Sequence, residues 1–221
     1  MKSAEKILVN EMFETIQGEA SYTGTPAVFI RLQGCPVGCA FCDTRQTWET
    51  DVPVIPILDM LKKTDDAENC ASMTVDQIIR QLDNYSARHV VITGGEPAMY
   101  DLTELTTAII DSVRSVQIET SGTFEIRCAE DTWITVSPKF NMPGGLPVLN
   151  SSLMLADEIK MPVGKERDIE LINELIVPYS ACDIWLQPIS QSAKATALCV
   201  KHAILNNWKV SIQTHKFLGV R

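Results

Sequence analysis

Three closely spaced cysteines, Cys35, Cys39 and Cys42, carry the strongest chemical signal in this chain. Their C-x3-C-x2-C spacing supplies three thiolates, which is one fewer than the four that complete the ligation of an iron–sulfur cluster. One iron would keep an open coordination position, as metals in catalytic sites do. The spacing therefore predicts a cluster that binds a small molecule and takes part in its chemistry.

A zinc site is the alternative interpretation of this loop. Zinc sites usually combine paired C-x2-C half-sites or histidines. The chain has a single C-x2-C pair, and its three histidines lie far from that pair in sequence. The spacing thus favours an iron–sulfur cluster over zinc. The remaining cysteines stand singly, and we expect ordinary thiols at Cys70, Cys128, Cys182 and Cys199.

Further polar or glycine-rich motifs each follow a short run of residues that favour β-strands. In a parallel barrel the carboxyl ends of the strands lie on one face, where active sites are built. We therefore expect these motifs and the cysteine loop to share one rim. The motifs are Thr93-Gly-Gly-Glu-Pro97, Glu119-Thr-Ser-Gly122, Ser137-Pro-Lys139 and Gln187-Pro-Ile-Ser190, and the expected strands are 27–32, 89–93, 116–120, 133–136, 158–161, 183–188 and 209–213.

Amphipathic helices are expected between several of these strands. Thr74-Val-Asp-Gln77 has the form of a capping box and predicts a helix start. Alternating strands and helices indicate a parallel sheet, but segment 121–132 is too short for a strand–helix–strand crossover. We expect an α/β fold, a partial, modified TIM-type (β/α)6 barrel with parallel strands and reduced helices. The other expected helices are 57–63, 102–113, 167–176 and 193–205.

Length and composition suit a single domain over residues 1–221, with 45% hydrophobic residues to fill its core. Segment 49–72 is expected to be an irregular insertion, either a plain surface segment or a lid or partner-binding element. The net charge of -9 argues against direct nucleic-acid binding. The chain shows no apolar leader and no run of transmembrane length, so we expect no membrane contact and a soluble, cytoplasmic protein.

The cysteine spacing resembles that of the radical S-adenosylmethionine superfamily. There the open iron binds the methionine part of S-adenosylmethionine, and one electron cleaves the sulfonium to give a 5′-deoxyadenosyl radical. Gly94-Gly-Glu-Pro97 resembles the superfamily's second motif, in which glycine lets the backbone approach the methionine amino group. The resemblance implies a [4Fe-4S] cluster on the three cysteines. It also implies contacts to S-adenosylmethionine from Phe41, Asp43, Gly94, Gly95, Glu96, Glu119, Ser121, Ser137, Pro138, Lys139, Gln187, Pro188, Ile189 and Ser190.

Three segments together are similar to the 7-carboxy-7-deazaguanine synthase family over nearly the whole chain: Phe13–Glu19, Cys42-Asp-Thr44 and Gln213-Thr-His-Lys216. That family converts 6-carboxy-5,6,7,8-tetrahydropterin into 7-carboxy-7-deazaguanine by a radical ring contraction with loss of ammonia. The product enters queuosine biosynthesis, a tRNA modification pathway. The resemblance departs from the expected pattern at Ala20, where we expect glycine, and at Ala98.

The same resemblance implies a lyase that is a homodimer, receives electrons from a donor such as flavodoxin and binds Mg2+ at Thr44. The cofactor-derived radical does the chemistry, so no side chain is assigned as a catalytic residue. Because a single hydroxyl cannot hold Mg2+ tightly, the substrate carboxylate and water would complete its shell. The alternative for Thr44 is a turn-stabilising role. Pterin contacts are expected at Ile16, Gln17, Gly18, Glu19, Arg31, Thr93 and His215.

Arg31 has support that does not depend on the resemblance. It is a charged residue inside an expected strand, and it needs an anionic partner there. That partner is either a substrate carboxylate or an internal salt bridge. Two rival functions share part of the pattern. A glycyl-radical-enzyme activase would share the cysteine loop and Gly-Gly-Glu-Pro, and an electron carrier would hold a closed cluster.

Overall fold

The computed structural model describes residues 6–64, 66–176, 178 and 182–220. Its strands form one sheet in the order β3-β1-β2-β4-β5-β6-β7-β8-β9. Neighbouring strands are parallel from β2 to β9, whereas β1 is antiparallel to both β2 and β3. The strands are β1 (Ile7–Ile16), β2 (Pro26–Leu32), β3 (Ala71–Met73), β4 (His89–Gly94), β5 (Ser115–Thr120), β6 (Trp133–Val136), β7 (Glu158–Val163), β8 (Asp183–Pro188) and β9 (Lys209–Val210).

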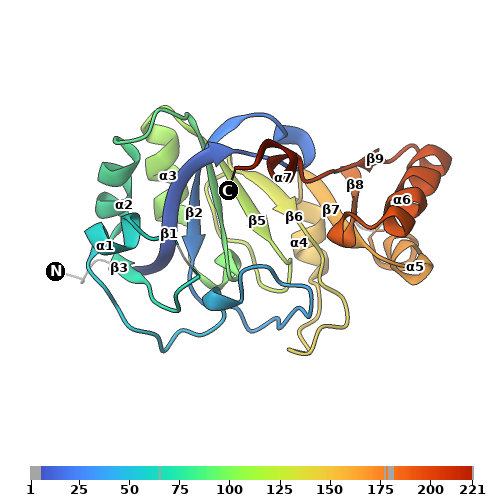
Figure 1. The fold of residues 1–221 in the computed structure, drawn as a ribbon, viewed down its shortest axis with the longest axis horizontal. Coiled ribbons are helices and arrows are strands. Elements are labelled where there is room, and N and C mark those ends of the chain that lie inside the picture. Colours follow the sequence, from blue (N-terminus) through green and yellow to red (C-terminus); the bar gives the residue numbers. More distant parts are fainter. Residues whose placement is uncertain (1–5, 65, 177, 179–181, 221) are drawn as a thin grey trace.

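Helices α1, α2 and α3 lie at one end of the sheet and α5 and α6 at the other, whereas α4 and α7 lie between these ends (Figure 1). No helix of the described chain lies between β5 and β6, as expected for so short a connection. The expected partial α/β barrel with reduced helices is therefore confirmed. The helices are α1 (Ile57–Leu61), α2 (Val75–Leu82), α3 (Thr103–Asp111), α4 (Asn150–Leu155), α5 (Glu166–Leu175), α6 (Ala193–Asn206) and α7 (Thr214–Leu218).

Most of the expected elements form where the pattern places them. The capping box is confirmed, since the Thr74 hydroxyl accepts from the Gln77 backbone and the Gln77 side chain accepts from Thr74. The expected strand 209–213 is wrong in length, because β9 ends at Val210. Ser211 still donates to the Leu186 carbonyl of β8, but farther along Thr214 bonds to the carbonyl of Gly18.

Strand β1 was absent from the expected elements because polar residues interrupt its apolar pattern. Asn10 and Glu11 are both buried, and a bulge falls between Val9 and Glu11. Asn10 donates to the Gln33 side chain at 2.7 Å, and Glu11 pairs with Arg31. Their partners come from other elements, so the alternation alone could not indicate a buried strand.

Segment 49–72 is anchored along the edge of the sheet. Val54 forms a bridge with Cys70, and β3, which follows, pairs with β1. The Lys63 ammonium donates to the Asn10 side chain at 3.1 Å and to the Ala67 carbonyl at 2.6 Å. Whether this segment also acts as a lid or partner element stays a prediction.

None of the helices in the described part of the chain has the length and apolar character needed to cross a bilayer.

The connection between β1 and β2 closes the sheet from the amino-terminal side. Tyr22 stacks on His89 of β4 with centroids 4.1 Å apart and meets Trp133 of β6 edge-on. The Ser21 backbone donates to Glu158 of β7 at 3.1 Å. His89, Trp133 and Glu158 are the first residues of their strands. We call residues 17–22 the floor segment, because Ser21 and Tyr22 pack against the amino ends of these strands, opposite the expected rim.

Candidate active site

A cavity of about 450 Å³ lies above the floor segment, at the carboxyl ends of the parallel strands. The cysteine loop and all four strand-end motifs contribute to its wall, so the expected shared rim is present. Pro138, which is buried, is the one predicted site residue that does not line it. The predicted residues that line the cavity are Ile16, Gln17, Gly18, Glu19, Arg31, Cys35, Cys39, Phe41, Cys42, Asp43, Thr44, Thr93, Gly94, Gly95, Glu96, Glu119, Ser121, Ser137, Lys139, Gln187, Pro188, Ile189, Ser190 and His215.

The cysteine loop places all three thiols at the cavity. Burial raises the pKa of Cys35 to about 11 and also raises the pKa of Cys39, which Lys139 opposes. Such thiols are protonated at neutral pH until a metal group displaces the protons. Cys42 accepts from the Thr44 backbone and the Trp48 indole, each at 3.4 Å. Hydrogen bonds to a ligating sulfur are among the groups that set a cluster's potential.

The thiols are not arranged around a single point. Among the described residues, no three Cys, His, Asp or Glu side chains are placed to hold one metal ion together. The three cysteines share a cavity wall, and three thiolates are the donor set of a cluster with one open iron. The residues present therefore fit an iron–sulfur cluster.

The glycine pair packs under the cysteine loop. A side chain at Gly95 would place its Cβ 2.1 Å from the Gly34 carbonyl oxygen, and one at Gly94 would lie 2.3 Å from the Leu32 nitrogen. Gly94 also has φ of +136°, where other residues are strained. The Glu96 backbone donates to the Gly34 carbonyl at 2.7 Å. Glycine is thus needed at both positions because the backbone at the end of β4 lies very close to the backbones of Leu32 and Gly34.

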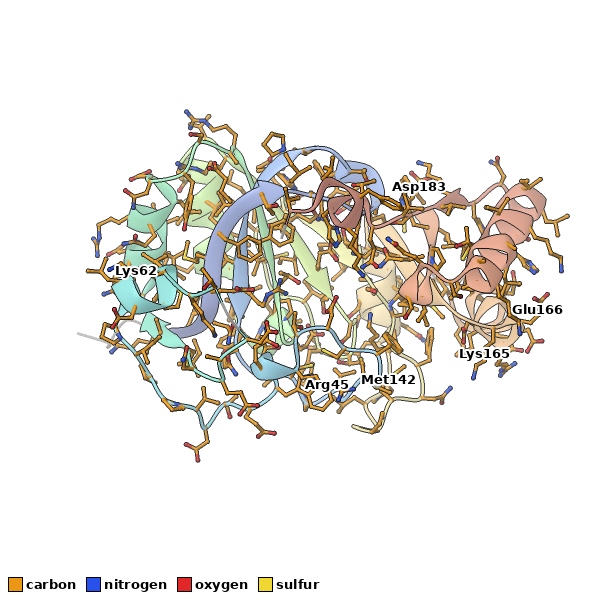
Figure 2. The ribbon with its side chains drawn as sticks, in the orientation of Figure 1. Arg45, Lys62, Met142, Lys165, Glu166 and Asp183 are labelled. Atoms are coloured by element: carbon orange, nitrogen blue, oxygen red, sulfur yellow. The ribbon has the colours of Figure 1, made fainter. Side chains whose placement is uncertain are left out.

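A third loop rests on the cysteine loop. The Gly144 backbone donates to the Val37 carbonyl at 3.1 Å, and a Cβ at Gly144 would lie 2.0 Å from the Pro36 carbonyl oxygen. Arg45 and Met142 mark these two loops at the lower edge of Figure 2. The segment after β6 therefore helps to hold the cysteines in place.

The carboxylate oxygens of Glu96 accept four hydrogen bonds from other residues of the protein. The residue is 1% exposed, and its carboxylate accepts from the Ala98 backbone at 2.9 Å, the Thr120 hydroxyl at 2.5 Å and the Ser121 backbone at 2.8 Å. The Ser121 hydroxyl donates to it as well. Glu96 thus ties the end of β4 to the end of β5 and orients Ser121. Its direct contact with a cofactor stays a prediction.

Lys139 brings a positive charge to the cavity wall. Its ammonium donates to the Ser137 carbonyl and hydroxyl, both at 2.7 Å. Burial lowers its pKa. In the described chain no carboxylate lies within ion-pair distance of it. A partly buried ammonium with neutral partners fits the carboxylate of a bound ligand.

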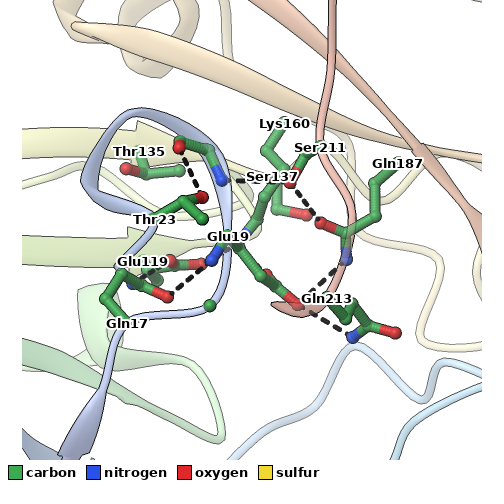
Figure 3. Close-up of polar contacts among 12 residues, drawn as sticks. Gln17, Glu19, Thr23, Glu119, Thr135, Ser137, Lys160, Gln187, Ser211 and Gln213 are labelled. Atoms are coloured by element: carbon green, nitrogen blue, oxygen red, sulfur yellow. Dashed lines mark hydrogen bonds and ion pairs between the residues drawn. The ribbon is translucent and has the colours of Figure 1, made fainter. Parts of the chain in front are cut away.

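Two carboxylates and one ammonium meet at the centre of the site (Figure 3). Lys160 of β7 donates to Glu19 of the floor segment at 2.5 Å and to Glu119 of β5. Burial acts to raise the pKa of Glu19, but the charge of Lys160 and its hydrogen bond outweigh that and lower it to about 2. Burial raises the pKa of Glu119, and Lys160 opposes this rise. The same two carboxylates raise the pKa of Lys160 against its own burial.

Glutamine amides complete this cluster. Gln17 donates to Glu119 at 3.1 Å, and its carbonyl accepts from the Glu19 backbone at 3.1 Å. Glu19 also accepts from Gln187 at 3.2 Å and from Gln213 at 2.8 Å. Lys160 and Gln213 line the cavity but were absent from the predicted site. Lys160 had a visible signal, since it is a charged residue inside an expected strand, as Arg31 is.

Arg31 has an internal partner. Its guanidinium pairs with Glu11 of β1 at 2.6 Å and lies 5.9 Å from the Phe13 ring centroid. The salt bridge that was the alternative for Arg31 is therefore present, while its side chain still lines the cavity. A substrate contact at Arg31 stays a prediction.

His215 and Gly18 are packed against each other. A Cβ at Gly18 would lie 2.1 Å from His215 Nδ1, so a larger residue at position 18 would displace the ring. Burial lowers the pKa of His215, which keeps the imidazole neutral at pH 7. A neutral imidazole can both donate and accept a hydrogen bond.

Thr44 lies in a hydrogen-bonded turn at the wall of the cavity. Its carbonyl accepts from the Thr47 backbone at 3.0 Å and the Thr47 hydroxyl at 2.7 Å, as in a stabilised turn. Its own hydroxyl is 3.7 Å from Cys42 Sγ, and the residue lines the cavity. Magnesium binding at Thr44 stays a prediction.

Comparisons with known proteins agree with this geometry. Residues 29–134 match the model of the Radical SAM superfamily. The chain is 49% identical to 7-carboxy-7-deazaguanine synthase from Escherichia coli K12 over 96% of this chain and 98% of that protein. A protein of the same name from Flavobacterium psychrophilum is 34% identical over 100% of this chain and 95% of its own length. The crystal structure of QueE from Escherichia coli has a TM-score of 0.90 and 48% identity, with 94% of each chain covered.

Proposed function

This chain belongs to the 7-carboxy-7-deazaguanine synthase family of radical S-adenosylmethionine enzymes, and from that premise we propose its substrate and the duties of its site residues. The reaction is the ring contraction of 6-carboxy-5,6,7,8-tetrahydropterin to 7-carboxy-7-deazaguanine with loss of ammonia. One observation carries the proposal: the three cysteines, the Lys139 ammonium and the Glu19 cluster line the same cavity of about 450 Å³. Its volume is in the range of small-molecule sites.

The cofactors of this family are a [4Fe-4S] cluster and S-adenosylmethionine, and the chain's residues would divide between them. When bound, these groups supply the radical that removes a hydrogen atom from the substrate. Cys35, Cys39 and Cys42 would hold the cluster. Lys139 would pair with the methionine carboxylate, since it has no other anionic partner in the described chain. Glu119 would accept from the ribose hydroxyls.

The pterin would be held from the floor segment and the C-terminal segment. Glu19 is an ionised acceptor whose Oε1 already accepts from Gln187 and Gln213 and whose Oε2 accepts from Lys160, so its remaining lone pair on Oε2 suits a ring N–H donor. Neutral His215 would bond a ring group, and Arg31 a carboxylate oxygen. Ile16, Gln17, Gly18 and Thr93 complete the proposed contacts, and all line the cavity.

Magnesium would complete the substrate's binding site at Thr44. Mg2+ is a hard cation that keeps several waters and prefers oxygen ligands. The Thr44 hydroxyl would be its one protein ligand, and the substrate carboxylate would supply another. A homodimer, a flavodoxin-type electron donor and a cytoplasmic location belong to the same proposal, because they follow from the family resemblance.

Two other functions fit the structure less well. An activase acting on a protein backbone has no use for Gln17, Glu19, Thr44 and His215 in the cluster cavity. An electron carrier needs no charged cavity beside its cluster. The shared position of these residues therefore favours a small-molecule substrate.

The test is turnover under anaerobic conditions. Reconstituted protein with S-adenosylmethionine, Mg2+, a reductant and 6-carboxytetrahydropterin should release 7-carboxy-7-deazaguanine and ammonia, measured by mass spectrometry and an ammonia assay. Cys39→Ala should lose both cluster and product, and Cys199→Ala, a buried thiol of α6, should retain both. Cleavage of S-adenosylmethionine without this product would reject the substrate assignment.

A further inference from the structure

Lys160 is a buried charged residue to which the proposed function gives no duty. Its side chain is 4% exposed, while those of Glu19 and Glu119 are each 14% exposed. The three groups come from β7, the floor segment and β5, so they meet only in the folded chain. Both carboxylates line the cavity, and Lys160 lines it between them.

The ammonium of Lys160 is the counter-charge of both Glu19 and Glu119. In the described chain Lys160 is the one cation paired with Glu19 or with Glu119. The other groups bonded to these carboxylates are neutral amides of glutamines. Neutral donors help, but two buried carboxylates in one site resist being ionised together without a counter-charge.

Other titratable groups face the trio from neighbouring elements without bonding to it. They are Glu158 at the start of β7, Lys139 after β6 and His215 of α7. Glu158 is held by the Thr135 hydroxyl at 2.7 Å and the Ser21 backbone at 3.1 Å. Burial keeps His215 neutral at pH 7. The counter-charge at bonding distance therefore comes from Lys160.

We propose that Lys160 is a positioning residue that keeps Glu19 and Glu119 both ionised and both directed into the cavity. Each carboxylate then accepts hydrogen bonds from a ligand donor. The ligand classes rest on the proposed function: ring N–H groups at Glu19 and ribose hydroxyls at Glu119. Without the ammonium, the two carboxylates would share a proton. The protonated carboxyl group would then point its O–H at an N–H or O–H group of the ligand, and no hydrogen bond could form between these two donors.

This role differs from simple stabilisation in its pH dependence. In a variant without the ammonium, the shared proton has to leave before both ligands bind. A carboxyl group whose pKa lies one unit above the buffer pH is ionised in about a tenth of the molecules, so apparent affinity falls about tenfold. Affinity should then rise as pH rises. A lost structural contact would weaken binding equally at every pH.

The first experiment needs no ligand, so it stays informative even if the proposed substrate is wrong. Infrared spectra of the reconstituted enzyme, with glutamate carboxyl carbons labelled, should show a protonated carboxyl band at pH 7 in Lys160→Met. Wild type should lack the band, and so should Lys209→Met, which removes an exposed lysine paired with Asp183. The double variant Lys160→Met/Glu119→Gln should lose the band, because one carboxylate remains.

The second experiment measures binding. Calorimetry of S-adenosylmethionine in buffers of different ionisation enthalpy should show proton release for Lys160→Met and none for wild type. The affinity of Lys160→Met should be about tenfold weaker at pH 7 and should recover towards higher pH. Lys160→Arg keeps the charge and should restore proton-free binding.

Several outcomes would overturn the proposal. One is a Lys160→Met enzyme with both carboxylates ionised at pH 7. Another is weaker binding with no proton release and no pH dependence, which would mark a structural role. If Lys160→Met does not fold, the charge-balanced double variant takes its place. Binding of S-adenosylmethionine by that variant as tight as in wild type would show that Glu119 and Lys160 do not shape the site.

Discussion

The rim and the floor of the cavity are held by different kinds of interaction. At the rim, Gly94 and Gly95 bring the end of β4 against the backbones of Leu32 and Gly34, and the cysteines lie within eight positions of one another. At the floor, side chains meet over long stretches of chain. Lys160 and Glu19 are 141 positions apart, and Gln213 and Glu19 are 194 apart. The rim is thus held by close backbone contacts around a cysteine loop that is local in sequence, whereas the floor is held by charged and amide side chains from distant segments.

This difference has a consequence for chemistry. At the rim, close backbone contacts hold the cysteines at fixed positions without any charged side chain. This arrangement suits an iron–sulfur cluster, which carries its own charge. The floor must instead present ionised acceptors in a buried place, which requires a counter-charge and several neutral donors. The effect of a substitution at the floor on stability should therefore vary with pH. The effect of a substitution at the rim should instead depend on the volume of the new side chain.

Glu19→Gln is expected to have the largest effect, because it breaks the floor cluster. The pKa of Glu19 lies near 2 in the folded protein, below its ordinary value of 4.5. Its contribution to the free energy of unfolding is therefore present above pH 4.5 and is lost as pH falls towards 2. We expect a loss on the order of 3 kcal/mol at pH 7 that shrinks on acidification.

Urea unfolding at pH 7, 5 and 3 would measure the Glu19→Gln effect. Glu130→Gln, at an exposed position outside the cavity, is the matched control and should stay near wild type. A loss that is the same at every pH would mean that the charge of Glu19 does not stabilise the floor.

Gly95→Ala tests the rim by space alone. The new methyl would lie 2.1 Å from the Gly34 carbonyl oxygen, so one backbone segment must move. Overpacking of this kind costs about 2 kcal/mol, and the cysteine loop should bind its cluster less completely. Iron content and urea unfolding measure both effects, and the loss should not vary with pH.

Gly164→Ala is the control for this rim variant. Its nearest neighbour to a new Cβ is 3.4 Å away, which is ordinary contact. A Gly95→Ala protein with full iron content and wild-type stability would contradict the interpretation that close backbone contacts hold the rim.

Thr44→Val addresses the edge of the rim, where the proposed magnesium ligand lies. Loss of one hydroxyl ligand should raise the Mg2+ concentration needed for half-maximal turnover by about tenfold. Iron content should not change, because Thr44 is not a cluster ligand. Thr47→Val removes a hydroxyl that bonds inside the turn, at 2.7 Å from the Thr44 carbonyl, and should leave the Mg2+ requirement unaltered. Loss of the cluster in Thr44→Val would instead assign Thr44 a structural role.

Ala20→Gly should have the smallest effect, and it tests whether the backbone of the floor segment is strained at this position. Ala20 has φ of +52°, where a Cβ is unfavourable, and its backbone donates to the Ser211 hydroxyl at 3.0 Å. Glycine relieves this strain but makes the unfolded chain more flexible. We expect a change of less than about 1 kcal/mol, of stabilising sign. Thermal unfolding would detect it, and clear destabilisation would show that the buried methyl matters more than the backbone.

Much of the rim could be predicted because its signals are local. The cysteine spacing, the glycine pair and the strand-end motifs each occupy a few consecutive residues, and parallel strands bring their ends together. The capping box at Thr74 is local in the same sense. Strand β1 was not predicted because the partners of Asn10 and Glu11 lie outside it: Gln33 directly follows β2, and Arg31 lies in β2. A pattern within one segment does not contain such partners.

By itself the sequence indicated the cysteines of a cluster, most of the parallel strands and most of the residues that line the cavity. Tertiary structure alone decided how these residues are charged and paired. It gave Arg31 a partner in Glu11, buried Glu96 among the donors of β5, and placed Lys160 between two carboxylates. The reason is physical: ligand type follows from residue identity and spacing, but ionisation and pairing follow from burial and distance, which exist only in the folded chain.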